Sequence, residues 1–492
     1  MNAGLTVLVL ALVLGAGEVR VGSKGFTESV VLGEIATRTL AASGIPAVHV
    51  RELGGTRILW EALQRGDLDI YPEYTGTLAE EIFSGGVPAT LEGLRPALAA
   101  HGVEIAAVLG FSNGYALGMR EPVAERLGIR RFSDLLRHPE LRFAFSNEFL
   151  DRGDGWRALQ RVYGFPQKDV RGMDHDLAYR GLESGAVDVT DLYSTDAEIR
   201  ALGLRVLEDD RRHFPDYQAV LLLRSQAATP AVRAALAGLD SRISAPEMVA
   251  LNARAKLDHV QEARVAAEFL QGAGLASAPA KTIGVAERLV VNLRDHLLLV
   301  AVALAGSVLV GLPLGILAAR RARLGQVVLG AVGVLQTLPS LAILVLMIPL
   351  LGIGARPAIA ALFLYGLLPV VRNTHAGLTG ISGELREAAE ALGLPGMTRL
   401  LRIDLPLASP SILAGVQTSA VICVGTATLG ALVGAGGFGQ PILTGIRLAD
   451  VGLLLQGAVP AALLALAVQG GFELLGRWVV PRGLRLPAPD ER

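Results

Sequence analysis

Two tyrosine-bearing turns in the first half of the chain have the spacing expected of a ligand site. Aligning the chain with itself so that Tyr74 meets Tyr193 superimposes LQRGDLDIYPEYTGT (63–77) on LESGAVDVTDLYSTD (182–196). Both copies have the pattern of a helix, a glycine stop, a strand and then the tyrosine. Ligands of open α/β folds bind at the carboxyl ends of strands. We therefore expect two lobes that each offer one turn to a shared cleft; the alternative is two ordinary strand–helix units with incidental tyrosines.

The segment around these turns, from residue 18 to about 275, alternates between strand and helix patterns. Helices are expected from Glu28 to Ala42, where SGIP follows, and from a cap at Thr56 to Gly66. The strands expected beside them are EVRVGS (18–23), VHVREL (48–53) and DLDIY (67–71). Strands separated by single helices predict parallel sheets of the open α/β type.

The composition places the second half of the chain in a membrane. Of the 492 residues 51% are hydrophobic, and long stretches after about residue 296 contain no charged side chain. The formal net charge of −1 gives a nucleic-acid partner no electrostatic support. The single cysteine, Cys423, excludes an internal disulfide framework and a thiolate metal cluster. No cofactor is expected in this chain. A metal is not expected either, because the spacing within MDHD (173–176) suits a solvated helix start better than a metal site.

Five transmembrane helices are expected between residues 297 and 480, after a linker at 276–296. Uncharged stretches that can span a bilayer are 297–319, 326–351, 451–472 and the shorter 357–371. The uncharged run from Leu405 to Ile446 is too long for one span. It must contain a helix together with re-entrant or interfacial backbone, and the glycines of GALVGAGGFGQP (430–441) favour that place for the non-helical part.

The arginines set the expected orientation. They follow alternate spans, as Arg320, Arg321 and Arg323, then Arg372, Arg386, Arg399 and Arg402, then Arg477, Arg482 and Arg485. Because basic loops stay inside, these loops and the tail 481–492 are expected in the cytoplasm, and the α/β half outside a bacterial-type plasma membrane. Residues 1–17 have the pattern of a signal peptide with a cleavage site, or of an uncleaved membrane anchor.

The cytoplasmic loop 384–406, ELREAAEALGLPGMTRLLRIDLP, resembles the EAA signature of ABC-importer permeases. The motif residues are Glu387, Ala388, Ala389, Gly393, Ile403, Leu405 and Pro406. The pattern predicts a short helix, a glycine–proline turn and a second helix leading into the membrane. The resemblance implies that this loop is the coupling helix that docks on an ATPase subunit. The alternative is an ordinary amphipathic connector.

An ATPase site is not expected in the chain itself. It has no G-x-x-x-x-G-K-[ST] phosphate loop, so the protein is predicted to be a transporter subunit and not an enzyme. A separate subunit would hydrolyse ATP. The resemblance implies that two copies of the chain pair through their permease domains and bind two ATPase subunits.

The exported half, over roughly residues 19 to 275, resembles the substrate-binding proteins of osmoprotectant importers of the glycine betaine, carnitine and choline type. The segments that carry the resemblance are VGSKGFTES, YPEYTGT, SNGYALGM, FLDRGDGW, DLYSTD and FPDYQAV. The membrane half is similar to the permease of the same systems. The implied architecture is an α/β two-lobed periplasmic-binding-protein fold of type II, followed by an all-α five-helix transmembrane ABC permease domain. Residues 18–275 form the binding domain, with lobe 1 at about 18–110 and 215–275 and lobe 2 at about 111–214, and residues 297–480 the permease.

The resemblance also implies the ligand-binding residues. A quaternary ammonium ion cannot donate a hydrogen bond, so it is held by dispersion and by aromatic ring faces, each worth about 0.5–2 kcal/mol. The matching motifs supply four rings, Tyr74, Tyr115, Tyr193 and Tyr217. Lys24 and Arg152 would take a carboxylate, assisted by Thr77 and the backbone amides of SKGFTE. Asn113 stands where some relatives carry an acidic group, which leaves choline against betaine preference open.

The expected function is that of an ABC importer subunit that captures a quaternary-ammonium osmoprotectant and passes it through its own permease domain. Two alternatives concern single residues: Lys24 as a surface charge, and Arg152 as a structural ion-pair partner of Asp151 or Asp154. Two others concern function. One is an importer of another small zwitterion, such as ergothioneine or an amino acid, and the other is a ligand-gated receptor or channel.

Overall fold

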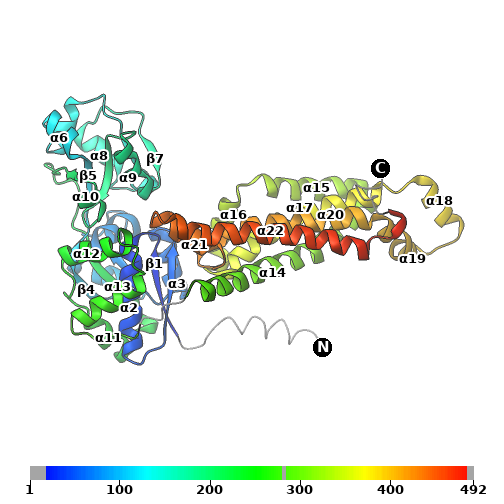
Figure 1. The fold of residues 1–492 in the computed structure, drawn as a ribbon, viewed down its shortest axis with the longest axis horizontal. Coiled ribbons are helices and arrows are strands. Elements are labelled where there is room, and N and C mark those ends of the chain that lie inside the picture. The colour runs from blue at the N-terminus through cyan, green and yellow to red at the C-terminus, as the bar shows by residue number, and fades with distance from the viewer. Residues whose placement is uncertain (1–17, 280–283, 485–492) are drawn as a thin grey trace. The chain divides into compact units, whose positions relative to one another are not determined.

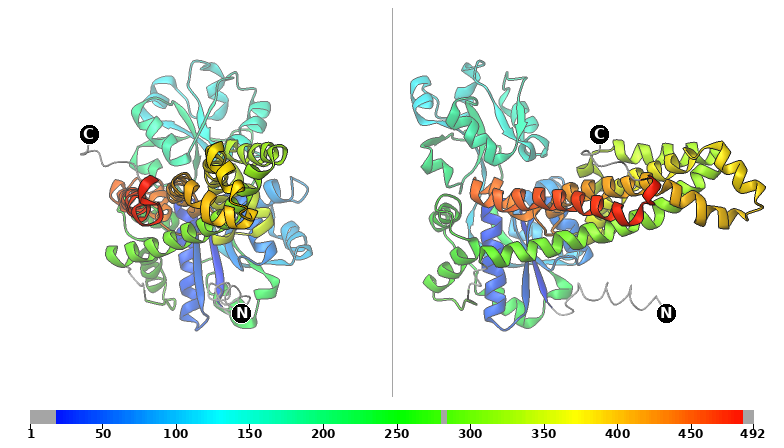
Figure 2. Two further views of the ribbon diagram at one scale, coloured as in Figure 1. Left: turned by 90° about the vertical axis from the view of Figure 1, so that its right-hand side faces the viewer. Right: turned by 45° about the vertical axis from the view of Figure 1, so that its right-hand side comes forward.

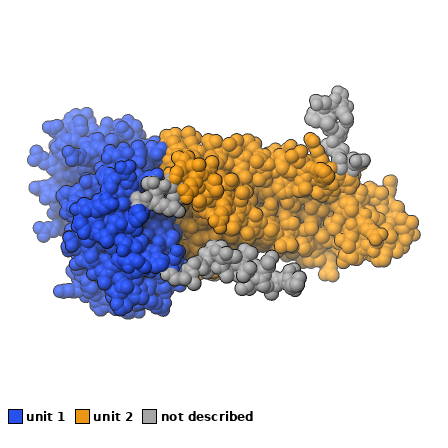
Figure 3. All heavy atoms as spheres, turned by 60° about the horizontal axis from the view of Figure 1, so that its bottom comes forward, with its two compact units in different colours: residues 1–282, 445–450 blue, residues 283–444, 451–492 orange. Residues whose placement is uncertain are grey.

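The computed structural model describes residues 18–279 and 284–484, which divide into two compact units. The first comprises residues 1–282 with 445–450, and the second residues 283–444 with 451–492 (Figure 3). The expected signal or anchor segment 1–17 and the end of the tail, 485–492, lie outside the described residues. The predicted combination of an α/β unit and a unit of long apolar helices is confirmed.

Lobe 1 of the first unit is built on a five-stranded sheet. Its strand order is β2 (Ala47–Leu53), β1 (Val19–Lys24), β3 (Ile70–Tyr74), β10 (Gln218–Arg224) and β4 (Val103–Ser112) (Figure 1). Strands β1, β2 and β3 pair in parallel, as predicted, but β10 is antiparallel to both β3 and β4. The expectation of a purely parallel sheet is therefore wrong. The antiparallel strand enters the sheet after the chain has traversed lobe 2, so no single crossover helix fixes its direction.

Helices cover the sheet of lobe 1 and close its core. They are α2 (Thr27–Ala42), α3 (Thr56–Arg65), α4 (Thr75–Thr77), α5 (Leu91–Ala100), α11 (Pro230–Ala237), α12 (Ala245–Lys256) and α13 (Glu262–Gly272). Val31, Leu32 and Ile35 of α2 are buried in the same cluster as Val21 and Leu221 of the sheet. Thr56 does not cap α3, because the N-cap residue is Gly55 and Thr56 is the first residue of the helix.

Lobe 2 has a smaller sheet and an aromatic core. Strands β8 (Val189–Tyr193), β5 (Tyr115–Arg120) and β9 (Leu204–Val206) form one sheet, and β6 (Ala144–Ser146) pairs with β7 (Arg171–Met173). Its helices are α6 (Glu121–Leu127), α7 (Asn147–Asp151), α8 (Trp156–Tyr163), α9 (His175–Ser184) and α10 (Glu198–Ala201). Buried rings, among them Phe132, Phe145 and Phe149, fill the space between these elements. The chain enters lobe 2 after Ser112 and returns to the lobe 1 sheet at Gln218.

The second unit is a bundle of long apolar helices (Figures 1 and 2). Helices α14 (Val285–Arg320), α17 (Ala355–Thr379) and α22 (Val451–Val479), and the segment Gly396–Val433, are long and apolar enough to cross a membrane. That last segment contains α19 (Gly396–Arg399) and α20 (Leu405–Thr426) and ends in a 3-10 helix, Ala427–Val433. Small residues let α14 and α17 approach closely, since a Cβ on Gly315 would meet the side chain of Thr374 at 2.5 Å.

The span expected at 326–351 is divided into two helices. Helices α15 (Ala322–Thr337) and α16 (Ser340–Leu351) meet at an angle of 98°. The break falls at Leu338, which has an extended backbone. Pro339 explains this conformation, because a proline disfavours the helical region for the residue that precedes it. The described residues thus contain four long apolar helices, or up to five if the bent pair counts as one span.

Two further predictions about the second unit can be compared with the structure. The glycine-rich segment 430–441 is irregular, as predicted, with left-handed backbone at Gly434, Gly436 and Gly437, before helix α21 (Gly439–Arg447) begins. The segment 276–296, expected to be a linker, already contains the start of α14 at Val285. In LVVNLRDHLLL (289–299) the apolar residues continue on both sides of the charged Arg294 and Asp295, so the helical pattern begins before the uncharged stretch.

The EAA loop has the predicted helix–turn–helix form. Helix α18 (Gly383–Ala391) ends where Gly393 adopts a left-handed backbone with φ of 65°, and its amide donates to the carbonyl of Glu390. After Pro395, α19 begins at Gly396 and continues through a π-helical turn into α20. The motif thus forms a compact knob at the start of a membrane helix.

Candidate functional site

The four predicted tyrosines all stand at or beside strand ends of the first unit. Tyr74 ends β3, Tyr193 ends β8, Tyr115 begins β5, and Tyr217 immediately precedes β10. The sequence pattern predicted Tyr74 in a turn after a strand at 67–71, but the strand runs from Ile70 to Tyr74. Tyr74 is therefore held by the sheet, where its backbone pairs with Ala219 of β10.

The rings of these tyrosines form one aromatic cluster with Phe26. The ring centre of Tyr115 lies 5.1 Å from that of Tyr193 and 5.9 Å from that of Tyr217. Tyr74 joins through Phe26, whose ring is 6.4 Å from Tyr74 and 5.5 Å from Tyr193. The cluster, which we call the aromatic site, consists of Phe26, Tyr74, Tyr115, Tyr193 and Tyr217. Since Phe26 belongs to lobe 1 and Tyr193 to lobe 2, the site bridges the two lobes.

Arg152 faces the aromatic site as an ion-paired cation. Its Nε and Nη2 atoms each donate to a carboxylate oxygen of Asp154 at 2.8 Å, so the ion pair with Asp154 that the alternative named is present. Its Cζ atom lies 4.8 Å from the ring centre of Tyr115 and 6.0 Å from that of Tyr217. Asp154 also accepts a hydrogen bond from the hydroxyl of Tyr217. Burial raises the pKa of the Asp154 carboxyl, but Arg152 and Tyr217 outweigh burial and lower it.

Lys24 is buried, so the alternative of a surface charge is wrong. Only 4% of the residue is exposed. Its ammonium group donates to Oε1 of Glu73 at 2.5 Å and to the hydroxyl of Thr56 at 2.7 Å, and lies 5.6 Å from the ring centre of Tyr74. The backbone amide of Lys24 donates to the Ser29 hydroxyl, so this amide of the SKGFTE turn is already engaged. Both predicted carboxylate ligands, Lys24 and Arg152, thus carry an acidic partner of their own.

Asn113 and Thr77 are both buried near the aromatic site. The side-chain amide of Asn113 donates to Oε1 of Glu28 at 2.9 Å. The hydroxyl of Tyr74 donates to the same oxygen at 2.6 Å. Thr77 ends α4, directly after β3, where the chain turns away from the sheet. The fold thus brings Asn113 and Tyr74 to one carboxylate, that of Glu28, which was not among the predicted site residues.

That carboxylate, Glu28, is the centre of a buried network. Its Oε2 accepts hydrogen bonds from the hydroxyl of Thr195 and, at 3.0 Å, from the side-chain amide of Asn252. Burial raises the pKa of Glu28 above its ordinary value, and the four hydrogen bonds oppose that rise. Thr195 lies in lobe 2, whereas Glu28 and Asn252 lie in lobe 1. The network therefore ties the lobes together beside the aromatic site.

His175 supports Tyr193 from within lobe 2. The two rings stack with centres 4.3 Å apart. The Nε2 atom of His175 lies 2.9 Å from Asp196, and Nδ1 lies 3.4 Å from Asp191. Burial alone would lower the pKa of His175, but Asp196 and Asp191 outweigh burial and raise it well above the ordinary value. MDHD was predicted to be a solvated helix start. Asp174 does cap α9 and is exposed, whereas only 15% of the His175 side chain is exposed.

Lys256 makes a second contact between the lobes. It ends α12 of lobe 1, and its ammonium group is ion-paired with Asp176 and Glu198 of lobe 2. Only 11% of its side chain is exposed. Burial alone would lower the pKa of Lys256, but these carboxylates outweigh burial and raise the pKa above its ordinary value. This pair of ion pairs, which we call the lobe latch, holds the lobes in contact.

Several of these residues escaped the sequence analysis. Phe26, Glu28 and Thr195 lie within segments that carried the resemblance, SKGFTES and DLYSTD, so their adjacency to predicted ligands was a usable signal. His175, Asn252 and Lys256 gave none, since each meets its partners only through the fold. No cluster of histidine, cysteine and acidic residues suited to a metal occurs in the described parts of the chain.

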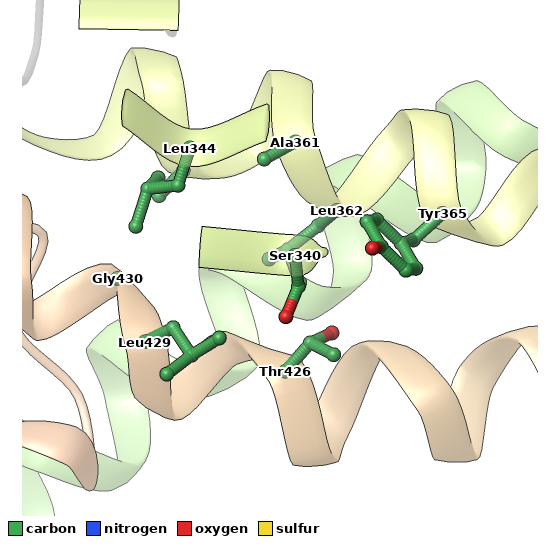
Figure 4. A pocket seen from close by; sticks show the side chains of 9 residues that line it. Ser340, Leu344, Ala361, Leu362, Tyr365, Thr426, Leu429 and Gly430 are labelled. Atoms are coloured by element: carbon green, nitrogen blue, oxygen red, sulfur yellow. The ribbon is translucent and has the colours of Figure 1, made fainter. Parts of the chain in front are cut away.

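A separate pocket lies within the second unit, between α16, α17 and the end of α20 (Figure 4). Its lining comprises Ser340, Leu344, Ala358, Ala361, Leu362, Tyr365, Thr426, Leu429 and Gly430. The side chains of Ser340 and Thr426 approach each other across it, and the Tyr365 hydroxyl donates to the carbonyl of Leu338. The pocket is narrow and mainly apolar, and it adjoins the break between α15 and α16.

Two families match this chain. Residues 17–272 match the family described as the substrate binding domain of ABC-type glycine betaine transport systems. Residues 311–482 match the family described as the inner membrane component of binding-protein-dependent transport systems. A solved structure described as a glycine betaine/carnitine/choline ABC transporter covers 52% of this chain and 98% of its own, with 29% identity and a TM-score of 0.45.

Individual relatives cover different shares of the chain. The glycine betaine/carnitine/choline transport system permease protein OpuCB of Bacillus subtilis (strain 168) is 39% identical over 39% of this chain and 88% of its own length. The osmoprotectant import permease protein OsmW of Salmonella typhimurium is 41% identical over 39% of this chain and 91% of its own. The ergothioneine transport permease/ergothioneine binding protein EgtU of Helicobacter pylori (strain G27) is 32% identical over 52% of this chain and 47% of its own.

Proposed function

Because this chain belongs to the family of ABC-type glycine betaine substrate-binding domains, here joined to an ABC importer permease domain, we propose that it captures a quaternary-ammonium osmoprotectant and delivers it to its own permease domain. Ligands of the glycine betaine, choline and carnitine type form the proposed class. The chain is a multi-pass inner-membrane protein of an ABC transporter that works with an ATPase and a small ligand.

The observation that carries this proposal is the aromatic site itself. Its tyrosine rings are gathered from both lobes, and positive groups already lie against three of them, Tyr74, Tyr115 and Tyr217. The guanidinium of Arg152 lies over Tyr115 and the ammonium group of Lys24 lies near Tyr74. Ring faces that attract these side chains attract a methylated ammonium group for the same electrostatic reason, and a ligand that lacks N–H donors has few other means of recognition.

The assembly and its orientation form the second part of the proposal. The arginine-rich loops and the C-terminus lie in the cytoplasm, and the binding domain lies outside. Two chains pair through their permease domains, and two ATPase subunits dock on the EAA loops. Support comes from the compact helical knob formed by α18, Gly393 and α19, whose surface suits a groove on another protein. ATP hydrolysis by the partner moves this knob and α20, and α20 belongs to the membrane bundle.

Transport follows from lobe closure. A ligand that contacts rings of both lobes favours the closed arrangement by its differential affinity. In that arrangement Thr195 meets Glu28 and Lys256 meets Asp176 and Glu198, so the lobe contacts and the ligand contacts stabilise the same state. The closed domain then presents the ligand to the permease, which releases it inward when the ATPase drives the change in access.

Binding to the purified full-length chain in detergent micelles tests the substrate class. Isothermal titration would use glycine betaine, choline, carnitine and ergothioneine, with glycine as the unmethylated control. We expect at least one methylated compound to bind and glycine not to bind. Tyr193→Ala should weaken that binding at least tenfold, whereas Tyr193→Phe should keep most of it, since the ring is retained. Absence of binding by every methylated compound, or unchanged affinity in Tyr193→Ala, would refute the proposal.

A further inference from the structure

Glu28 differs from the other buried carboxylates of the first unit in having no ion-pair partner among the described residues. The others are each paired with an arginine, lysine or histidine: Glu34, Glu52, Asp69, Glu73, Asp154, Asp191, Glu198 and Glu262. Only 3% of Glu28 is exposed. A buried charge without an opposite charge is costly, so proteins rarely keep one unless something else neutralises it.

The hydrogen bonds around Glu28 can satisfy both oxygens of an ionised carboxylate. Oε1 accepts from Tyr74 and Asn113, and Oε2 accepts from Thr195 and Asn252. The two amide nitrogens can only donate, whereas each hydroxyl can donate or accept. Four donors satisfy both oxygens of the anion. Burial opposes the anion and raises the pKa of the Glu28 carboxyl, so a stable negative charge here calls for a positive charge nearby.

The position of Glu28 joins this charge to the aromatic site. Tyr74 belongs to the site and donates to Glu28 at 2.6 Å, and Phe26 of the site is two residues away on the same turn. A phenol that donates to an anion gains electron density in its ring, which strengthens the attraction of the ring face for a cation. Glu28 therefore acts on a ligand through Tyr74 and through its own field.

The other charged groups near the aromatic site compensate one another. Lys24 is paired with Glu73, and Arg152 is paired with Asp154 through two hydrogen bonds. Both basic residues expected to hold a ligand carboxylate are therefore already neutralised in part by an acidic neighbour. Glu148, 3.9 Å from Nη1 of Arg152, is also acidic, but its side chain is 40% exposed and water screens its charge. Glu28 is the buried carboxylate of the described first unit that no cation neutralises, and its negative charge favours a ligand that is positive overall.

Resting on the proposed function, we infer that Glu28 supplies the counter-charge of the aromatic site and is a specificity-determining positioning residue. The site therefore prefers quaternary ammonium ions that carry no carboxylate, of which choline is the simplest hydroxylated example, over zwitterionic betaines. Asn113 is neutral, and its side-chain amide donates to Glu28. Glu28 therefore supplies the negative charge that an acidic residue at position 113 would supply.

The wild-type full-length chain gives the first test, with three ligands of similar shape. Choline, glycine betaine and the neutral isostere of choline, 3,3-dimethyl-1-butanol, would be titrated under one set of conditions. We expect choline to bind about tenfold or more tightly than glycine betaine, and the neutral isostere to bind more weakly than choline by at least as much. Equal or tighter binding of glycine betaine would overturn the inference and leave the proposed function standing. If none of the methylated ammonium compounds binds, the proposed function itself fails.

The second test removes the charge and then restores it nearby. Glu28→Gln keeps the shape of the side chain, and the Thr195 hydroxyl can rotate to accept from the new amide. We expect choline to lose at least tenfold in affinity and glycine betaine to lose less than about threefold. In Glu28→Gln/Asn113→Asp the carboxylate returns within the same network, and the preference for choline should recover. A merely structural role would weaken both ligands alike and would not be rescued by Asn113→Asp.

Thr195→Val provides the matched comparison. It removes one hydrogen bond to Glu28 but keeps the charge, so it should leave the ratio of choline to glycine betaine affinity within about threefold of wild type. A ratio that falls in Thr195→Val as far as in Glu28→Gln would overturn the inference. Thermal unfolding of each variant would be measured alongside; if Glu28→Gln does not fold, the wild-type series with the neutral isostere still decides the question.

Discussion

The guanidinium carbon of Arg152 lies 4.8 Å from the centre of the Tyr115 ring, on the aromatic site. Its Nε and Nη2 atoms donate to Asp154. The third nitrogen, Nη1, makes a longer contact with Glu148, at 3.9 Å. Arg152 thus has two opposing effects on a ligand. It repels an ammonium group that approaches Tyr115, and it can attract a carboxylate through the remaining donor.

Removal of the Arg152–Asp154 pair should separate these two effects. In Arg152→Gln/Asp154→Asn both charges are replaced together, so neither is left buried without a partner. We expect glycine betaine to bind about tenfold more weakly and choline to bind as well as in wild type or better. Titration of both ligands checks this. Arg142→Gln/Asp188→Asn, which removes a pair with similar bidentate contacts outside the aromatic site, is the control and should change neither affinity. Equal weakening of the two ligands by the Arg152 variant would contradict a role in carboxylate recognition.

Lys256→Met should weaken every ligand to a similar degree. The variant removes the lobe latch and leaves Asp176 and Glu198 without their cation, and losing one member of a buried ion pair costs about 3 kcal/mol or more. If the cost falls on the closed state, affinity should drop at least tenfold for choline and glycine betaine alike, mainly through faster dissociation. Stopped-flow measurement of dissociation checks this. Lys168→Met, at an exposed lysine, is the matched control. A selective loss of one ligand would show that Lys256 acts on the ligand and not on closure.

The sequence predicted the elements better than it predicted their partners. Apolar periodicity located α2, and long stretches without charged residues located the membrane spans, because each of these patterns is local. The direction of β10 could not be read from them, since this strand pairs with β3 and β4 after a long excursion. The bend before Pro339 was readable in principle, because the residue before a proline leaves the helical region. The bend was not predicted, because the absence of charged residues throughout 326–351 indicated a single span.

For the site, too, the sequence indicated local patterns but not the contacts between distant segments. The repeat around Tyr74 and Tyr193 indicated a shared site, and the structure brings both rings to Phe26. By contrast, Lys256 lies far along the chain from Asp176, and no local pattern joins them. Buried ion pairs depend on packing of distant segments, so a charged residue that looks like part of a solvated helix face in sequence can be a buried contact in the fold.

The pH dependence of stability should carry the signature of His175. Burial opposes its protonation, but Asp196 and Asp191 outweigh burial and raise its pKa well above the ordinary value, with Tyr179 and Tyr193 as its other neighbours. A raised pKa means that its contribution to stability is fully present below about pH 6.5 and is lost as the pH rises through the folded-state value. The unfolding temperature of wild type should therefore fall between about pH 6.5 and pH 9. His175→Phe retains a ring beside Tyr193 but cannot titrate, so its unfolding temperature should be lower at pH 6.5 and should change less over the same range. An identical slope in both proteins would contradict this assignment.

Gly393→Ala should reduce transport without changing ligand affinity. Gly393 has φ of 65°, a backbone conformation that costs an alanine roughly 1 kcal/mol or more. That strain would distort the turn between α18 and α19, and with it the surface proposed to dock on the ATPase. Gly396→Ala is the matched control, because Gly396 begins α19 with an ordinary backbone and a Cβ there meets no atom within 4 Å. Uptake of radiolabelled choline in proteoliposomes containing the ATPase partner, measured beside choline titration of the same variants, checks this. We expect several-fold slower uptake in Gly393→Ala and near wild-type uptake in Gly396→Ala, with equal affinities in both. Unchanged uptake in Gly393→Ala would show that the EAA turn tolerates distortion and that coupling depends on other parts of the loop.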